Sequence, residues 1–160
     1  MIFVTVGSQK FQFNRLLIEI DKLIEKNVIQ PDDVFAQSGH SNYQPKLYKY
    51  KQFLNNDEFV KMVKNCNVLL THGGTGAIIN GVKSKKKVIA VPRLAEYGEH
   101  VDNHQFDIVE QFEKSNLIYG LKEIEYLEKA LNEIKYINFN DYKSNTNNII
   151  NLIQEFIERL

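Results

Sequence analysis

Short apolar runs alternate with longer amphipathic stretches along the 160-residue chain. In the longer stretches apolar residues recur every three or four positions, as they do on one face of an α-helix. The runs predicted as strands cover residues 2–6, 33–37, 46–54, 67–71, 87–92 and 116–119. The stretches predicted as helices cover residues 12–27, 55–65, 75–84, 101–114, 123–135 and 146–160. This alternation predicts βαβ units, and therefore an α/β fold with a mostly parallel sheet and helices on both faces.

Most of the glycines follow predicted strands. Right-handed crossovers place the carboxyl ends of parallel strands at one edge of the sheet, and ligands of such sheets bind at that edge. The glycines in this position are Gly7, Gly39, Gly73, Gly74, Gly76 and Gly98, whereas Gly81 and Gly120 lie elsewhere. One such glycine would be a turn residue, but six that converge on one edge predict a ligand site.

The stretch "LLTHGGTGAIING" (69–81) places three glycines within four residues, where a predicted strand leads into a predicted helix. It lacks the lysine of a P-loop and the third glycine of G-x-G-x-x-G. A helix N-terminus with free N–H groups and a positive dipole end nevertheless binds phosphate without a lysine. We therefore predict a phosphate site at Gly73, Gly74, Thr75 and Gly76, with Thr75 as a helix cap or hydroxyl donor. A strand-to-helix turn without a ligand is the alternative.

The loop "VPRLAEYGEHVDNHQ" (91–105) is rich in ionisable groups and leads into a helix. Asp102, His104 and Gln105 offer hydrogen bonds to sugar hydroxyls. Arg93 either faces an anion or pairs with Glu96 or Glu99.

His100 and His104 stand at i, i+4 spacing, which would suit a metal on one helical face. No cysteine lies nearby and the sequence shows no obvious third ligand. We therefore interpret them as part of a polar cluster at a helix N-terminus and predict no metal site.

Two further strand ends contribute polar residues. Ser8 follows the first strand, where it either binds phosphate or caps the helix that Asn14 and Arg15 begin. The loop 37–46 carries His40 and Tyr43 and is either an acceptor-side or gating loop or a loop without a ligand.

Composition excludes some classes of protein. Lys and Arg together number 20, as do Asp and Glu, so the chain lacks the basic charge typical of nucleic-acid binding. The basic run "KSKKK" (83–87) falls at the predicted end of a helix, where lysines suit the dipole.

The single cysteine, Cys66, is predicted to pack in the core and favours a reducing cytosol. No apolar run reaches the length of a membrane span.

The runs "VTVGSQKFQFNRL", "HGGTGAI" and "VPRLAEYGEHVDNHQ" resemble the small bacterial polysaccharide-synthesis enzymes of glycosyltransferase family 28. They also resemble the donor-binding half of the peptidoglycan N-acetylglucosaminyltransferase. A third similarity is to the soluble subunit of the eukaryotic two-subunit enzyme that adds N-acetylglucosamine to dolichol-linked sugar. The resemblance covers residues 1 to about 120, and the third run is most similar to the capsule and exopolysaccharide branch, where β-1,4-galactosyl transfer is the commonest activity.

This resemblance implies a Rossmann-like domain over residues 1–160, equivalent to the donor half of a GT-B enzyme. It implies a UDP-sugar substrate, no cofactor and no metal, with the diphosphate at Gly73–Gly76 and Ser8. Asp102, His104 and Gln105 would lie near the donor sugar, and Arg93 is assigned to the same end. Asn80 stands where many relatives carry a glutamate that binds the ribose.

The resemblance also implies a membrane-anchored partner that supplies the acceptor domain and recruits this cytoplasmic chain to the membrane. The helix 146–160 is a candidate docking element for the partner, or packs on this chain's own sheet; without the partner a homodimer is expected. The residues assigned to the acceptor or partner side are Gly7, Asn14, Arg15, Gly39 and His40.

The predicted reaction is inverting transfer of a hexose, with galactose favoured, to a lipid-linked saccharide. His100 and Glu99 are the candidate bases, unless the partner supplies the base. The alternatives are a non-catalytic nucleotide-sugar-binding accessory subunit and a UDP-N-acetylglucosamine transferase. A dehydrogenase fits poorly, because the first strand ends in "VGSQKF" rather than in G-x-G-x-x-G.

Overall fold

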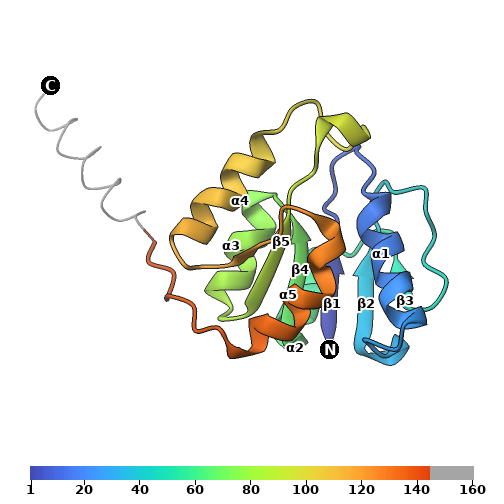
Figure 1. Cartoon of the computed structure of the whole chain (residues 1–160), viewed down its shortest axis with the longest axis horizontal. Helices are drawn as coiled ribbons and strands as arrows, with labels where there is room; N and C mark the ends of the chain where they lie inside the picture. The colour runs from blue at the N-terminus through green and yellow to red at the C-terminus, as the bar shows by residue number, and fades with distance from the viewer. Residues whose placement is uncertain (145–160) are drawn as a thin grey trace, which may run out of the picture.

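All six strands of the sheet run parallel, in the order β3-β2-β1-β4-β5-β6. The computed structural model describes residues 1–144 (Figure 1). The strands are β1 (Ile2–Thr5), β2 (Val34–Gln37), β3 (Lys49–Lys51), β4 (Val68–His72), β5 (Lys87–Val91) and β6 (Tyr119–Gly120). The α/β fold and its parallel sheet, predicted from the pattern of strands and helices, are confirmed.

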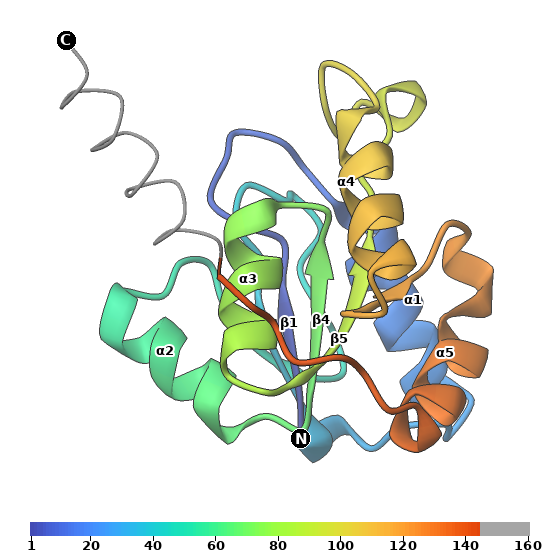
Figure 2. The ribbon, with the colours of Figure 1, turned by 90° about the vertical axis from the view of Figure 1, so that its left-hand side faces the viewer.

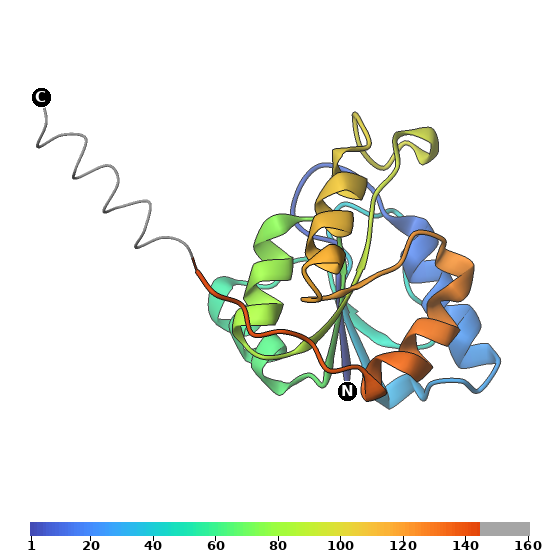
Figure 3. The same cartoon turned by 60° about the vertical axis from the view of Figure 1, so that its left-hand side comes forward.

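Helices cover both faces of this sheet (Figures 2 and 3). Helices α1 (Asn14–Glu25) and α5 (Leu127–Glu133) cover one face, and α2 (Asn56–Asn65), α3 (Thr75–Lys83) and α4 (His104–Lys114) cover the other. Successive strand residues point to opposite faces, so Val4 packs in the cluster under α1 and α5, whereas Phe3 packs under the other three helices. Because both faces are covered, the central strands are apolar along their length.

Several predicted boundaries are wrong, each for a local reason. The strand predicted at 116–119 begins only at Tyr119, because Asn116 adopts a left-handed turn with φ 52°. The strand predicted at 46–54 shortens to the exposed edge strand β3. The helix predicted at 101–114 begins at His104, whose N–H donates to the Asp102 side chain.

The predicted helix 123–135 is divided into three pieces. A 3-10 turn, Ile124–Tyr126, precedes α5, and a second, Ile134–Tyr136, follows it. The remaining 3-10 turns are Pro31–Asp33 and Ala95–Tyr97. The helix predicted at 146–160 lies outside the described residues. Within residues 1–144, none of the helices combines the length and the apolar character needed to cross a bilayer. Cys66 is buried in the core, and its burial raises the pKa of the thiol.

The loops that follow β1, β4 and β5 gather at the carboxyl edge of the sheet, opposite the chain's N-terminus (Figure 1). This arrangement follows from the parallel strands, since every crossover returns the chain to the same starting edge. The edge is therefore the place to examine for a ligand site.

Candidate functional site

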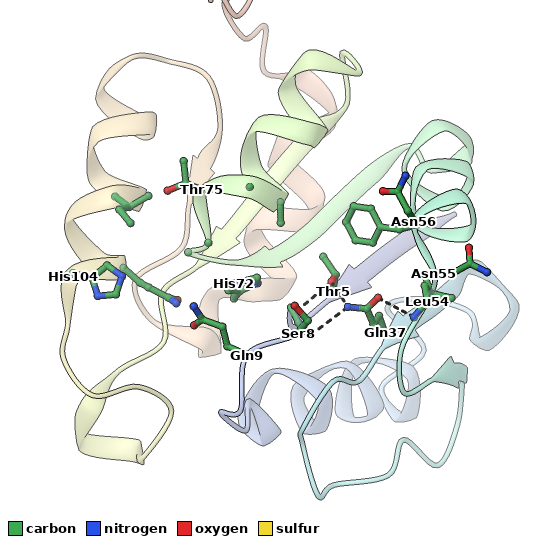
Figure 4. Close-up of a pocket in the computed structure, with 18 residues that line it drawn as sticks. Thr5, Ser8, Gln9, Gln37, Leu54, Asn55, Asn56, His72, Thr75 and His104 are labelled. Atoms are coloured by element: carbon green, nitrogen blue, oxygen red, sulfur yellow. Dashed lines mark hydrogen bonds between the residues drawn. The ribbon is translucent and has the colours of Figure 1, made fainter.

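A cavity of about 520 Å³ opens at this edge. The loop after β1, the ends of β2 and β4, and the first turns of α2, α3 and α4 form its walls (Figure 4). Eight residues that the sequence assigned to a ligand line it: Gly7, Ser8, Gly73, Gly74, Thr75, Gly76, His104 and Gln105. Gly7, which was assigned to the acceptor side, therefore lies with the predicted phosphate residues.

The glycine turn leaves the start of α3 open to this cavity. Gly74 is the N-cap residue, and no side chain in the described part of the chain caps the helix. Thr75 is its first residue, so its predicted role as the cap is wrong, although its side chain lines the cavity. The first intrahelical bond runs from Ile78 N to Gly74 O, which leaves the N–H groups of Thr75, Gly76 and Ala77 for other acceptors.

The glycines of the turn serve different purposes. A Cβ atom on Gly73 would lie 2.8 Å from the Gln105 Cβ, so this glycine lets the turn approach α4. A Cβ on Gly74 would overlap the His72 ring. A Cβ on Gly76 would meet nothing within 4 Å among the described residues. Packing therefore requires the first two glycines, whereas Gly76 leaves space beside the helix start.

His72, the last residue of β4, packs under this turn. Its side chain contacts the positions of both Gly7 and Gly74 and lines the cavity. Burial, and then the nearby charge of Arg93, lower the pKa of His72 from 6.5 to about 4. The imidazole is therefore neutral at pH 7. No role was predicted for His72, although its position as the last strand residue before the glycines was a signal.

Gln105 connects the turn to the loop after β5. Its side chain is buried, and its Oε1 accepts a hydrogen bond from the Arg93 backbone N–H at 3.1 Å. It also lines the cavity beside His104, at the wall formed by α4. His104 and Gln105, which the resemblance assigned to the donor sugar, therefore both lie on the wall of this cavity.

Arg93 does not line this cavity. It is fully buried, and its Nη2 donates to the backbone oxygens of Val6 and Phe11 in the loop after β1. Its Nε and Nη1 have no partner among the described residues. Burial lowers the pKa of Arg93 to about 10, so the guanidinium remains charged at pH 7. Arg93 braces the loop instead of contacting a ligand directly.

Glu99, a candidate base, is also a structural residue. It is 1% exposed, and its carboxylate accepts from Arg15 Nε at 2.8 Å and from the Leu94 N–H at 3.1 Å. The predicted ion pair of Arg93 with Glu96 or Glu99 is therefore wrong, because Arg15 occupies the Glu99 carboxylate. Arg15 also donates to Pro92 O at 2.7 Å, which ties α1 to the loop after β5.

His100, Asp102 and His104 form a cluster at the start of α4. The Asp102 Oδ1 atom contacts the Nδ1 atoms of both histidines, at 3.2 Å from that of His100 and closer to that of His104. Hydrogen bonds from the side chain and the backbone N–H of His104, then the charge of His104 and a hydrogen bond from His100, hold the pKa of Asp102 below its usual value. Asp102 lies beside the cavity without lining it. Each of the three residues offers one atom that could bind a metal ion, and these atoms lie within 4.8 Å of one another.

The far end of the cavity holds residues that the sequence analysis missed. Gln37 donates from Nε2 to Gly7 O at 3.3 Å and accepts from Leu54 N at 3.2 Å, which holds two loops together. Thr5, Asn55 and Asn56 also lie at this end (Figure 4). Phe59, in the first turn of α2, lines the cavity as well. A signal was available, because the pair Asn55-Asn56 follows a predicted strand at the same edge.

Five further predicted site residues also lie outside the lining of the cavity. Asn80 is exposed on α3, beyond its first turn. Asn14 and Arg15 line a second cavity, of about 600 Å³, between α1 and the loops after β5 and β6. Gly39 is buried with φ 56°, and His40 stacks edge-on against Phe53 at 5.1 Å. The structure thus divides the predicted acceptor-side residues among several places.

Comparison with known proteins identifies relatives of this chain. The model of the glycosyltransferase family 28 C-terminal domain matches residues 1–160. The UDP-N-acetylglucosamine transferase subunit ALG13 of Candida albicans is 32% identical over 83 residues, which are 51% of this chain and 24% of that protein. The chain therefore spans about a quarter of this relative.

Two solved structures share the fold. The glycotransferase of kitacinnamycin superposes with a TM-score of 0.62 at 16% identity, and SnogD of Streptomyces nogalater with a TM-score of 0.55 at 14% identity. Each match covers 83% of this chain and 34% of the other. Because the family model matches the whole chain, the protein belongs to the family of the glycosyltransferase family 28 C-terminal domain.

Proposed function

We propose that this chain is the donor-binding subunit of an inverting glycosyltransferase, which transfers a hexose from a UDP-sugar to a lipid-linked saccharide. One observation carries the proposal: the uncapped start of α3 opens into a cavity that has polar walls on both sides. A volume of about 520 Å³ is of the size that binds a small ligand.

In this proposal the diphosphate accepts hydrogen bonds from the N–H groups of Thr75–Ala77 and from Ser8. The hexose then points toward His104 and Gln105, and the nucleoside toward the far end. There Phe59 offers an apolar surface and Gln37 and Asn55 offer polar atoms. Because Asn80 lies outside the cavity, the ribose would be bound without it.

The chemistry assigned to this chain is stabilisation of the leaving UDP. The N–H groups and the dipole of α3 meet the negative charge that develops as the glycosidic bond to the diphosphate breaks. His72 beneath the turn is neutral and adds no charge of its own, whereas the buried cation of Arg93 lies close enough to lower the pKa of His72. The proposal includes no cofactor and no metal in the transfer step.

The base is proposed to come from a membrane-anchored partner, which would also bind the acceptor and hold this chain at the cytoplasmic face. Glu99 is occupied by Arg15, and no carboxylate of the described residues lines the cavity. The resemblance favours galactose as the hexose, whereas the name of the Candida relative points to N-acetylglucosamine. In the absence of the partner we expect a homodimer.

Isothermal titration of the untagged chain with UDP, UDP-galactose, UDP-glucose and UDP-N-acetylglucosamine tests the proposal. UDP should bind, and one UDP-sugar should bind more tightly than the other two. Absence of UDP binding would contradict the donor site. Tight binding of UDP without preference among the sugars would leave the donor site standing and assign sugar selection to the partner.

The absence of a carboxylate from the described cavity wall also favours a second function, that of an accessory subunit that binds the nucleotide sugar without contributing to transfer. Co-expression with the partner and assay of His104→Ala separates the two. A catalytic donor subunit should lose most of the transfer activity, whereas an accessory subunit should retain it.

A further inference from the structure

We infer that His100, Asp102 and His104 bind one transition-metal ion of the Zn²⁺ class beside the donor cavity. The inference does not depend on the identity of the donor. The three residues follow an His-x-Asp-x-His pattern at the point where the loop after β5 enters α4.

The ligand atoms converge on one point. The Nδ1 atoms of both histidines face the same carboxylate oxygen, and one ligand atom from each of the three residues lies within 4.8 Å of the others. Two ligand atoms at about 2.1 Å from a tetrahedral zinc stand roughly 3.4 Å apart. The 3.2 Å between His100 Nδ1 and Asp102 Oδ1 fits that spacing.

The shorter contact between His104 and Asp102 must open slightly to admit an ion. Both side chains are about half exposed, at 49% and 57%, so they have room to move apart. His100 is held more firmly. Its side chain is 8% exposed, and its ring packs on Phe11 with the centroids 4.7 Å apart. One fixed ligand and two adjustable ones suit capture of an ion from solvent.

The chemistry of the donor set selects the class of ion. Two imidazole nitrogens and one carboxylate oxygen suit Zn²⁺ and its neighbours, whereas Mg²⁺ and Ca²⁺ prefer all-oxygen sites. Three protein ligands leave a tetrahedral position for water. The ion would therefore be a clamp, joining the tip of the loop after β5 to the first turn of α4 and, through Phe11, to the loop after β1.

The site is tested with the untagged, chelator-treated chain and added ZnCl₂, by isothermal titration and by thermal unfolding. The wild type should bind one Zn²⁺ per chain and melt at a higher temperature when zinc is present. His100→Ala and the isosteric Asp102→Asn should each weaken binding at least tenfold, roughly the smallest effect of disturbing a metal shell. Co²⁺ should give visible absorption bands in the wild type that both variants lose.

His40→Ala is the matched control, because it removes another histidine from a loop at the same edge without touching the cluster. It should bind zinc as the wild type does. The inference is overturned if the wild type shows no saturable binding, or if His40→Ala weakens binding as much as His100→Ala does. It is also overturned if Asp102→Asn, folded by circular dichroism, binds zinc with unchanged affinity. UDP titration of the same zinc-free wild type reports on the donor site separately.

Discussion

Two helices begin at the same edge of the sheet and border the same cavity, yet their first turns differ. At α2, the Asn55 side chain accepts from Glu58 N and the Glu58 carboxylate accepts from Asn55 N, each at 2.9 Å. Asp57 adds a second acidic residue to that turn. At α3, the N-cap is Gly74, without a capping side chain in the described structure, and the first turn has no acidic residue.

The comparison separates a closed helix start from one that is open to a ligand. The capping box at the start of α2 satisfies two N–H groups, those of Asn55 and Glu58, and the acidic residues of its first turn offset the helix dipole. The first turn of α3 does neither, so an anion that arrives there meets free donors and an uncompensated positive end. Both helix starts border the cavity, so the missing cap and the missing carboxylates are what favour α3 over α2 as the start that binds phosphate in the proposed function.

The most severe test is to give α3 the acidic residue that α2 has. Gly76→Asp has room for its side chain, and an aspartate in a first turn favours the helix, so the fold should persist. A carboxylate about 6 Å from a phosphate costs about 3 kcal/mol at an effective dielectric constant near 20, roughly a 100-fold loss of UDP affinity. Isothermal titration measures the UDP affinity, and the isosteric, neutral variant Gly76→Asn is the control. Equal UDP affinity of the two variants would remove the diphosphate from this turn.

The open turn should also be sensitive to acid, because His72 lies beneath it. The pKa of His72 is about 4 in the folded chain and 6.5 unperturbed, so the unfolded chain binds the proton more readily. The stability contribution is complete above pH 6.5 and is lost as the pH falls toward 4. Urea unfolding at pH 7 and pH 4.5 should show a loss of about 2–3 kcal/mol that His72→Gln does not share. An identical pH dependence in the variant would show that the loss comes from other groups.

Alanine substitutions at Gly74 and Gly76 should change the stability of the fold in opposite directions. Gly74→Ala places a Cβ against the His72 ring and should destabilise the fold by about 1–3 kcal/mol. Gly76→Ala meets open space within the helix and should stabilise it by about 0.5–1 kcal/mol. Thermal unfolding of the pair, each the control of the other, measures the difference. A stable Gly74→Ala variant would mean that His72 is not fixed beneath the turn.

The smallest effect is expected at the closed helix start. Asn55→Ala removes the cap of α2 and should cost about 1 kcal/mol of stability. Asn56→Ala, at the next and likewise exposed position, is the control and should change stability by less than about 0.5 kcal/mol. Chemical denaturation resolves this difference. If both variants have the same free energy of unfolding, the capping box does not stabilise α2. The start of α2 would then no longer serve as the capped example against which α3 is compared.

The elements and the glycine turn could be predicted because their signals are local. Apolar periodicity located every strand and all the described helices, and the run of glycines after β4 identified the open helix start. His104 and Gln105 line the cavity, as predicted, because they form the first turn of a helix that begins at the carboxyl edge of the sheet. Boundaries failed where one residue decided them, as Asn116 does before β6.

Arg93 shows what the sequence could not supply. An arginine in a polar loop after a strand suits an anion site as well as it suits a brace. The choice depends on the backbone oxygens of Val6 and Phe11, which are more than 80 positions away. Asn80 failed for a related reason, since its distance from the cavity depends on how α3 is rotated against the sheet.

The hydrogen bonds from Arg93 to the loop after β1 have a consequence for the order in which the site forms during synthesis. The loop after β1 is made early, but Arg93 follows Val6 by 87 positions and Glu99 follows Arg15 by 84. Contacts between residues so far apart in sequence form late, because the entropy cost of closing a long loop must be met before the contacts can stabilise the fold. A chain still being translated therefore carries Gly7 and Ser8 without a fixed loop. The nascent protein should form the cavity at the carboxyl edge only after residue 105 has left the ribosome.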